Sequence, residues 1–284
     1  LFILARRFSA THFWDEILAA DATMFVYIGE LCRYLVNQPP RPQDRDSKIR
    51  MAFGNGLRPD VWRKLRARFK IPEVLEFYGS TESGAVTFAT SEDALKKPGT
   101  VGRIAPGAEL RFLSEDGRVQ PPGQIGEIYS RIASNPDFTY HNKPAKRAEI
   151  DRDGFITSGD VGYIDEDGYV FLCDRKRDMV ISGGVNIYPA EIEAVLIAMP
   201  GVRDCAVFGI PDDEFGESLC AYVEPETGAA LAPADVHAFL APKLAKYKIP
   251  KLVEISAALP REDSGKIFKR KLRAPYWEKA GRRI

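Results

Sequence analysis

The sequence predicts an α/β fold that includes a small antiparallel β unit and is followed by a compact α+β domain. Three observations support this prediction. Helix and strand patterns alternate over residues 1–97, short alternating runs fill residues 98–174, and helix and strand patterns mix again over residues 175–284. Alternating helices and strands are typical of a largely parallel sheet covered by helices, whereas short strands joined by tight turns are typical of antiparallel sheets.

The first third of the chain carries the helix and strand patterns of the predicted α/β region. Thr11 can cap the first helix, and a run of prolines ends the second. Pro59 begins the third helix, in which Val61, Leu65 and Phe69 recur every four residues and form one apolar face. The expected helices are 11–20, 30–36 and a helix from Pro59, and the expected strands are 23–28, 48–53 and 74–77.

Residues 98–174 show shorter runs in which apolar and polar residues alternate. Glycine-containing turns such as Asp116-Gly117 and Asp167-Gly168 separate these runs, which is the pattern of antiparallel hairpins. The expected strands include 109–113, 127–131 and 169–173.

A charged stretch, Asp174-Arg175-Lys176-Arg177-Asp178, marks a candidate linker between two domains. The residues beyond it have the length of a normal small domain. Helices are expected at 190–199 and 234–240, and strands at 205–210, 219–223 and 252–255.

Composition excludes several classes of protein. Lys+Arg and Asp+Glu both number 40, so no global field draws the chain to nucleic acid. The four cysteines form no C-x-x-C pair and there are only three histidines, which excludes the common zinc spacings and predicts reduced thiols in the cytoplasm. No apolar run approaches the roughly 18 residues of a membrane-spanning helix. The chain starts without methionine, which suggests the middle of a longer protein.

The segment Tyr78-Gly79-Ser80-Thr81-Glu82 follows an expected strand. It combines an aromatic face, a flexible glycine, two hydroxyl groups and a carboxylate. At the carboxyl end of an α/β sheet, such a set can stack on a base, donate to phosphate and hold Mg²⁺. A polar turn after a buried strand is the simpler interpretation of this segment taken alone.

Three further segments permit ligand contacts but are weak indicators singly. In Thr157-Ser158-Gly159-Asp160, the aspartate can accept the hydroxyls of a ribose or satisfy N–H groups of its own turn. The glycines of Ser182-Gly183-Gly184-Val185-Asn186 allow a ligand to approach the backbone, or simply form a hairpin connection. Lys266 follows Ser264-Gly265 without the earlier glycine of a P-loop, and a loop lysine is most often solvent-exposed.

The order and spacing of these segments are more specific than any one of them. The chain resembles the adenylate-forming enzymes, which include acyl-CoA synthetases, luciferases and the adenylation domains of peptide synthetases, and the resemblance covers nearly the whole chain. Residues 27–35 and 54–62 look like the fatty-acid transport protein and very-long-chain branch, whereas residues 179–186 look more like medium- and long-chain synthetases. The matching segments are 76–82, 155–160, 174–193 and 259–273.

The resemblance implies a site for ATP and AMP. Tyr78 would lie against adenine, Thr81 would contact a phosphate, Glu82 would hold Mg²⁺, and Asp160 would bind the ribose hydroxyls with help from Arg175. The nucleotide-binding residues expected from the resemblance are Gly54, Asn55, Gly56, Tyr78, Gly79, Ser80, Thr81, Asp160, Arg175 and Lys266.

The resemblance also implies that the second domain moves. Residues 1–174 would be the C-terminal portion of an AMP-binding large domain, and residues 175–284 a hinge and a lid. Arg177 falls at the hinge, where many relatives carry Asp or Lys. Gly183 and Gly184 would face the CoA side, and Lys266 would bridge the acyl carboxylate and the α-phosphate. Lys266, Glu82 and Thr81 are therefore the expected catalytic residues.

The expected activity is ligation of a fatty acid or a related carboxylic acid to coenzyme A, driven by ATP and passing through an acyl-adenylate. The family's Ser/Thr/Gly-rich phosphate loop is not in the sequence, so we expect a fragment that has little activity alone. The alternatives are a non-catalytic module that binds nucleotide or CoA, and an adenylation domain that serves a carrier protein. The expected location is cytoplasmic, and a peripheral membrane contact and a homodimer stay open.

Overall fold

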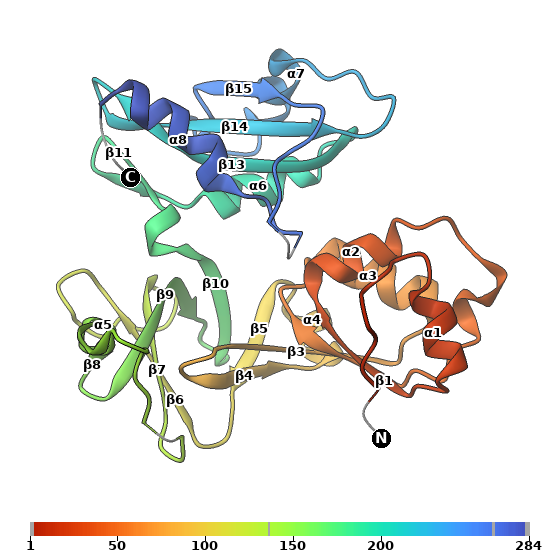
Figure 1. Ribbon diagram of the computed structural model, residues 1–284. Coiled ribbons are helices and arrows are strands. Elements are labelled where there is room, and N and C mark those ends of the chain that lie inside the picture. Colours follow the sequence, from red (N-terminus) through yellow and green to blue (C-terminus); the bar gives the residue numbers. More distant parts are fainter. Residues whose placement is uncertain (1–2, 136, 263–264, 282–284) are drawn as a thin grey trace. The chain divides into compact units, whose positions relative to one another are not determined.

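The computed structural model describes residues 3–135, 137–262 and 265–281. Its contacts divide the chain into two compact units, Leu1–Leu172 and Cys173–Ile284. The predicted α/β class is confirmed, since each unit contains a sheet and helices that pack on it (Figure 1).

The first unit begins with three parallel strands covered by helices on one face. Trp14, Phe25, Leu65 and Phe69 meet in the core between the helices and the strands, with the Trp14 and Phe69 rings 4.3 Å apart. The strands are β1 (Met24–Ile28), β2 (Met51–Asn55) and β3 (Glu73–Ser80), and the helices are α1 (Phe13–Ala19), α2 (Gly29–Val36) and α3 (Pro59–Phe69), with a short 3-10 turn at Pro42–Arg45.

The opposite face of β1 is open. Because successive side chains of a strand point to opposite faces, Phe25 and Tyr27 are buried while Met24, Val26 and Ile28 are exposed. The other face of β2 and β3 carries the stacked rings of Phe53 and Phe77, 5.0 Å apart.

The remaining strands of the first unit are antiparallel and continue the same sheet. Its hydrogen-bonded order is β1-β2-β3-β4-β5-β10-β9-β7-β6, so the antiparallel region that the sequence predicts joins the parallel strands through β4. The strands are β4 (Gly84–Ala89), β5 (Thr100–Ile104), β6 (Ala108–Leu113), β7 (Gly126–Ile132), β8 (Asp151–Arg152), β9 (Phe155–Ile164) and β10 (Tyr169–Arg175), and the short helices are α4 (Ser91–Lys96) and α5 (Pro144–Glu149).

The second unit is a five-stranded sheet with helices on both faces. Side chains of α6 and α7 share a core with Val207 and Ala221, whereas α8 packs on the other face, where the Trp277 indole donates to the Gly209 carbonyl at 3.1 Å. The strands are β11 (Val180–Ser182), β12 (Val185–Ile187), β13 (Val202–Asp212), β14 (Gly216–Pro225) and β15 (Leu252–Ile255), the helices are α6 (Pro189–Ile197), α7 (Pro233–Leu240) and α8 (Lys269–Lys279), and 3-10 turns lie at Lys176–Asp178 and Lys246–Lys248.

No helix within the described ranges is both long and apolar enough to span a bilayer.

Candidate active site

A hydrogen-bonded group joins two of the predicted motifs within the first unit. The Tyr78 hydroxyl donates to Oδ2 of Asp160 at 3.0 Å, and the Ser158 hydroxyl donates to the same oxygen at 2.6 Å. Tyr78 and Asp160 are 82 residues apart in the sequence. The structure therefore brings an aromatic ring and a carboxylate together, as a site for a base and its ribose requires.

A bulge in β9 directs Ser158 and Asp160 toward Tyr78. The sequence suggests a turn at Thr157-Ser158-Gly159-Asp160, but this segment lies inside the strand Phe155–Ile164. The pairing register with β7 shifts here, and Gly159 has a φ of +78°. Glycine adopts that conformation without the steric cost that other residues incur, and bulges commonly re-aim side chains next to active sites.

The sequence suggests a turn at Gly54-Asn55-Gly56, but the first two residues belong to β2. This end of β2 and the Gly56 that follows are packed closely against β1 and the start of α2. A Cβ atom at Gly54 would lie 2.2 Å from the Tyr27 carbonyl oxygen, so only glycine fits there. Asn55 ends β2 and is half-buried, and Gly56 follows it with a φ of +71°. Leu57 then donates its backbone N–H to Oε1 of Glu76 at 2.8 Å, which ties this turn to the strand that carries Tyr78.

Glu76 was not identified from the sequence. Burial raises its pKa to about 7, although the hydrogen bond from the Leu57 N–H acts in the opposite direction. Burial also raises the pKa of Tyr27 and of Cys32, both of which lie near this carboxylate. Glu76 lies two residues before Tyr78 in β3, so the two side chains share one face of the strand. This spacing is the sequence signal that could have identified Glu76 as a site residue.

Thr81 and Glu82 lie at the tip of the hairpin between β3 and β4. The Ser80 backbone N–H donates to the Ser83 hydroxyl at 3.2 Å, and the Ser83 N–H donates to the Ser80 hydroxyl at 3.1 Å, so the tip is closed on itself. Thr81 is exposed and Glu82 is half-buried. Gly79 and Ser80 are the last two residues of β3, and are not part of the polar turn that the sequence suggests after this strand.

Tyr140 is a second residue of the candidate site that the sequence patterns do not identify. Its hydroxyl donates to Oε1 of Glu82 at 2.8 Å. Burial acts to raise the pKa of Glu82, but the hydrogen bonds from Tyr140, the backbone and Ser80 outweigh it and hold this pKa below the ordinary value. The Glu82 carboxylate is therefore ionised at neutral pH.

The Glu82 carboxylate suits a hard cation. Mg²⁺ is commonly bound by one or two carboxylates together with substrate phosphates, without a dedicated protein cage. Across the part of the chain that the structure describes, no three His, Cys, Asp or Glu residues cluster into such a cage. A single ionised carboxylate at an accessible hairpin tip fits Mg²⁺ that arrives with a nucleotide.

Arg175 and Arg177 lie where the second unit begins. Asp174 fixes this segment to α6, because its Oδ2 accepts the Ala190 backbone N–H at 2.9 Å. Arg175 ends β10, and the 3-10 turn Lys176–Asp178 follows it. The Arg177 side chain is 74% exposed and lies 4.0 Å from Asp178, a distance at which a surface ion pair is weak.

Gly183 and Gly184 form the two-residue turn between β11 and β12. Their φ angles are +57° and +79°, as a tight hairpin turn of this kind requires. A Cβ atom at Gly183 would lie 3.2 Å from the Phe215 ring, whereas one at Gly184 would meet no atom within 4 Å. The turn is exposed, and apolar side chains flank it at Ile181, Val185 and Phe215.

Lys266 is exposed, while residues on both sides of it are anchored in the second unit. Before it, Arg261 donates to Asp204 at 2.8 Å and pairs with Ile267 in an isolated β-bridge. After it, Lys269 begins α8 and forms an ion pair of 2.7 Å with Glu193 on α6. Asp263 and Ser264 of the same loop lie outside the described residues.

The predicted site residues therefore fall into two sets. The first unit holds Gly54, Asn55, Gly56, Tyr78, Gly79, Ser80, Thr81, Glu82 and Asp160, and hydrogen bonds link Tyr78 directly to Asp160 and the Gly54–Gly56 turn to β3 through Glu76. The second unit holds the other five, in three separate segments: Arg175 and Arg177 at its start, Gly183 and Gly184 in the turn between β11 and β12, and Lys266 before α8.

Two family models match the chain. Residues 2–135 match the model described as AMP-binding enzyme, and residues 191–266 match the model described as AMP-binding enzyme C-terminal domain. The matched ranges contain Tyr78, Glu82 and Lys266, whereas Asp160 lies between them.

Named relatives and solved structures agree with these models. The chain is 39% identical over 216 residues to the fatty acid–[acyl-carrier-protein] ligase ScoC of Streptomyces coeruleorubidus. The matched region covers 75% of the chain and 41% of the relative. It is 35% identical over 274 residues to the long-chain-fatty-acid–CoA ligase FadD13 of Mycobacterium tuberculosis, covering 95% of the chain and 53% of the relative. ATP-bound MatB from Rhodopseudomonas palustris superposes with a TM-score of 0.86 at 35% identity, over 96% of this chain and 54% of that one. The chain spans about half the length of the curated relatives it matches.

Proposed function

The chain belongs to the family of AMP-binding enzymes, and we propose on this basis that it is part of an ATP-dependent ligase that joins a carboxylic acid to coenzyme A through an acyl-adenylate. The contact between Tyr78 and Asp160 carries the proposal, because it brings together two of the predicted motifs that are 82 residues apart in the sequence. Residues 1–174 would then be the end of an AMP-binding large domain, and residues 175–284 a hinge with a lid, a division two residues beyond the boundary between the two units.

The nucleotide would bind to the first unit. The Tyr78 ring would lie against adenine, beside the Gly54–Gly56 turn, and the Asp160 carboxylate would accept hydrogen bonds from the ribose hydroxyls. Ser158 and Tyr78 already donate to this carboxylate. They therefore hold it in one orientation before the ligand arrives, which lowers the entropy cost of binding.

The phosphates would extend toward the hairpin tip. Thr81 is exposed there and offers a hydroxyl donor, and Glu82 would hold Mg²⁺ together with the phosphate oxygens. When bound, Mg²⁺ would neutralise part of the charge that the phosphates carry.

In the adenylation step, a carboxylate oxygen of the acid attacks the α-phosphorus, and the bond from that phosphorus to the bridging oxygen breaks. The electron pair leaves with pyrophosphate. Because two anions must approach each other, a cation lowers the barrier, and Lys266 would supply it with its ammonium group. Arg175 would assist Asp160 at the ribose.

In the second step, the thiolate of CoA attacks the acyl carbonyl and AMP leaves with the electron pair. Gly183 and Gly184 would allow the pantetheine arm to pass close to the backbone, since no side chain projects from this turn. The segment around Arg177 would absorb the rotation between the two steps, as short hinges do.

An apolar carboxylic acid, such as a fatty acid, is our proposed substrate. FadD13, a long-chain-fatty-acid–CoA ligase by name, is similar over 95% of the chain. We place the reaction in the cytoplasm, where ATP and CoA are available and where the four free cysteines would stay reduced.

A carrier protein is the second candidate acceptor. ScoC, by name a fatty acid–[acyl-carrier-protein] ligase, shares 39% identity with the chain. Both acceptors present a pantetheine thiol, so comparing thioester formation with CoA and with a pantetheinylated carrier protein would distinguish them.

The direct test uses a chimera that joins this chain to the half of MatB that it does not span. We expect exchange of labelled pyrophosphate into ATP that depends on a fatty acid, and formation of a thioester when CoA is added. A folded chimera that binds ATP but shows no acid-dependent exchange would contradict the ligase proposal.

A further inference from the structure

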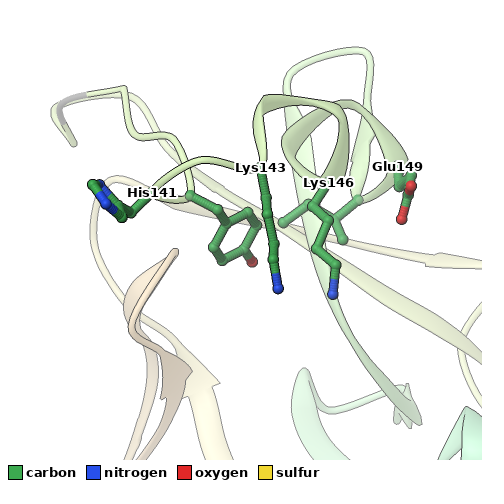
Figure 2. A pocket seen from close by; sticks show the side chains of 6 residues that line it. His141, Lys143, Lys146 and Glu149 are labelled. Atoms are coloured by element: carbon green, nitrogen blue, oxygen red, sulfur yellow. The ribbon is translucent and has the colours of Figure 1, made fainter.

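A cavity of about 470 Å³ opens beside the segment that contacts Glu82. Two lysines, a histidine and the Tyr140 ring take part in its wall. Figure 2 shows the side chains of Lys143 and Lys146 pointing in the same direction, with His141 turned away from them. The residues lining it are Tyr140, His141, Lys143, Lys146, Glu149 and Ile150.

Two hydrogen bonds attach this segment to the hairpin tip. Tyr140 donates to the Glu82 carboxylate at 2.8 Å, and the Asn135 amide donates to the Ser83 carbonyl at 2.8 Å. Tyr140 therefore both lines the cavity and contacts Glu82, and a ligand whose metal ion is held at Glu82 would lie beside this wall of the cavity.

The charges around the cavity are unequally compensated. Arg147, which follows Lys146 on α5, forms ion pairs with Asp151 at 2.6 Å and with Asp137 at 3.3 Å. In the part of the chain that the structure describes, neither Lys143 nor Lys146 forms an ion pair with a carboxylate. Glu149 is the one acidic residue in the cavity wall. Two ammonium groups thus face a space next to a carboxylate suited to Mg²⁺.

We propose that Lys143 and Lys146 form a subsite for the β- and γ-phosphates of ATP, which leave as pyrophosphate. This inference rests on the proposed function. A phosphate chain bridged by Mg²⁺ at Glu82 carries more negative charge than the ion neutralises, and that charge grows on the leaving group as the bond to the α-phosphorus breaks. Two lysines on one side offset it, and they select a ligand with two linked phosphates over a single phosphate.

Binding to the chain itself tests the subsite without requiring activity. We would titrate the chain with pyrophosphate in the presence of Mg²⁺ at fixed ionic strength, and compare it with Lys143→Ala/Lys146→Ala. Since both lysines are exposed, we expect the dissociation constant to rise by about tenfold. The charge-retaining pair Lys143→Arg/Lys146→Arg should bind nearly as well as the wild type, and Lys64→Ala, at an exposed position of α3, should bind equally well.

Several outcomes would overturn the subsite. One is an unchanged pyrophosphate affinity in the double alanine variant, and another is inorganic phosphate that binds as tightly as pyrophosphate. A third is a double alanine variant that binds 3′-phosphoadenosine 5′-diphosphate more weakly but pyrophosphate as well as the wild type does. That result would assign the lysines to the phosphates of CoA instead. Titration with AMP separates this proposal from the proposed function: a chain that binds AMP but no pyrophosphate keeps the nucleotide site and loses the subsite.

Discussion

The nucleotide side of the first unit and the Lys266 loop of the second unit hold their functional groups in different ways. In the first unit the functional side chains contact each other, since Tyr78 and Ser158 both donate to Asp160. In the second unit Lys266 extends into solvent, and the residues that are fixed are Arg261 before it and Lys269 after it.

This difference indicates a division of labour. A carboxylate already oriented by two donors is suited to binding, because little ordering remains to be done when the ligand arrives. An exposed lysine between two anchors is suited to supplying charge for one step and then withdrawing. We therefore expect substitutions in the first unit to change affinity, and substitutions in the second unit to change rates.

The largest expected effect is that of Lys266→Ala. In the chimera with the remaining half of MatB, acid-dependent pyrophosphate exchange should fall by about 10²- to 10³-fold, as when one group that stabilises transition-state charge is removed. AMP affinity should stay within about twofold, because the proposed contacts to adenine and ribose through Tyr78 and Asp160 remain in place. Lys271→Ala, an exposed lysine on α8, is the matched control, and equal exchange rates in the two variants would remove Lys266 from the mechanism.

The next effect concerns Glu76 and pH. Its pKa rises from 4.5 to about 7 on folding, so the folded protein holds a proton that the unfolded chain releases. The contribution of this group to stability is therefore fully present below about pH 4.5. It is lost as the pH rises toward 7 and changes no further above that. The total loss is about 3 kcal/mol at most.

Glu76→Gln isolates this contribution, because an amide oxygen can still accept the Leu57 N–H without ionising. Urea unfolding at pH 5.5 and pH 8 should show the variant gaining stability over the wild type at the higher pH. Glu16→Gln, at an exposed position on α1, is the matched control. A Glu76→Gln difference that is constant with pH would mean that this carboxylate titrates normally.

A smaller effect is expected at Glu193, which anchors the Lys266 loop. Its Oε1 accepts the Val207 N–H at 2.6 Å and the Lys269 ammonium at 2.7 Å. Glu193→Ala leaves both donors unsatisfied and should lower the free energy of unfolding by about 2 kcal/mol. Chemical denaturation measures this loss, with the exposed Glu278→Ala as control. Equal stabilities of the two variants would show that the ion pair does not anchor α8.

The sequence predicts most elements of both units, but not the contacts that build the site. The helix from Pro59 is predicted because Val61, Leu65 and Phe69 follow the helical period, and all three are buried. The contact between Tyr78 and Asp160 cannot be read from local patterns, because it depends on the path of the sheet from β3 through β4, β5 and β10 to β9.

Helix α8 shows why other elements escape prediction. Pro275 lies inside it, and proline disfavours a helix interior. Tertiary contacts stabilise the helix instead: the Tyr276 and Tyr222 hydroxyls are 2.9 Å apart, and Trp277 donates to Gly209. Glu76 and Tyr140 escaped for a related reason, since only burial and a partner from a distant segment distinguish them from ordinary surface residues.

The central claim is that Asp160, held by Tyr78 and Ser158, binds the ribose of an adenine nucleotide. Calorimetric titration of the chain with AMP and with 2′,3′-dideoxy-AMP, in the wild type and in Asp160→Ala, tests it most directly. We predict that the substitution weakens AMP binding by at least about tenfold, the value of a hydrogen bond to a charged group, and leaves the dideoxy analogue nearly unaffected. Equal AMP affinity in a folded Asp160→Ala variant would contradict the account.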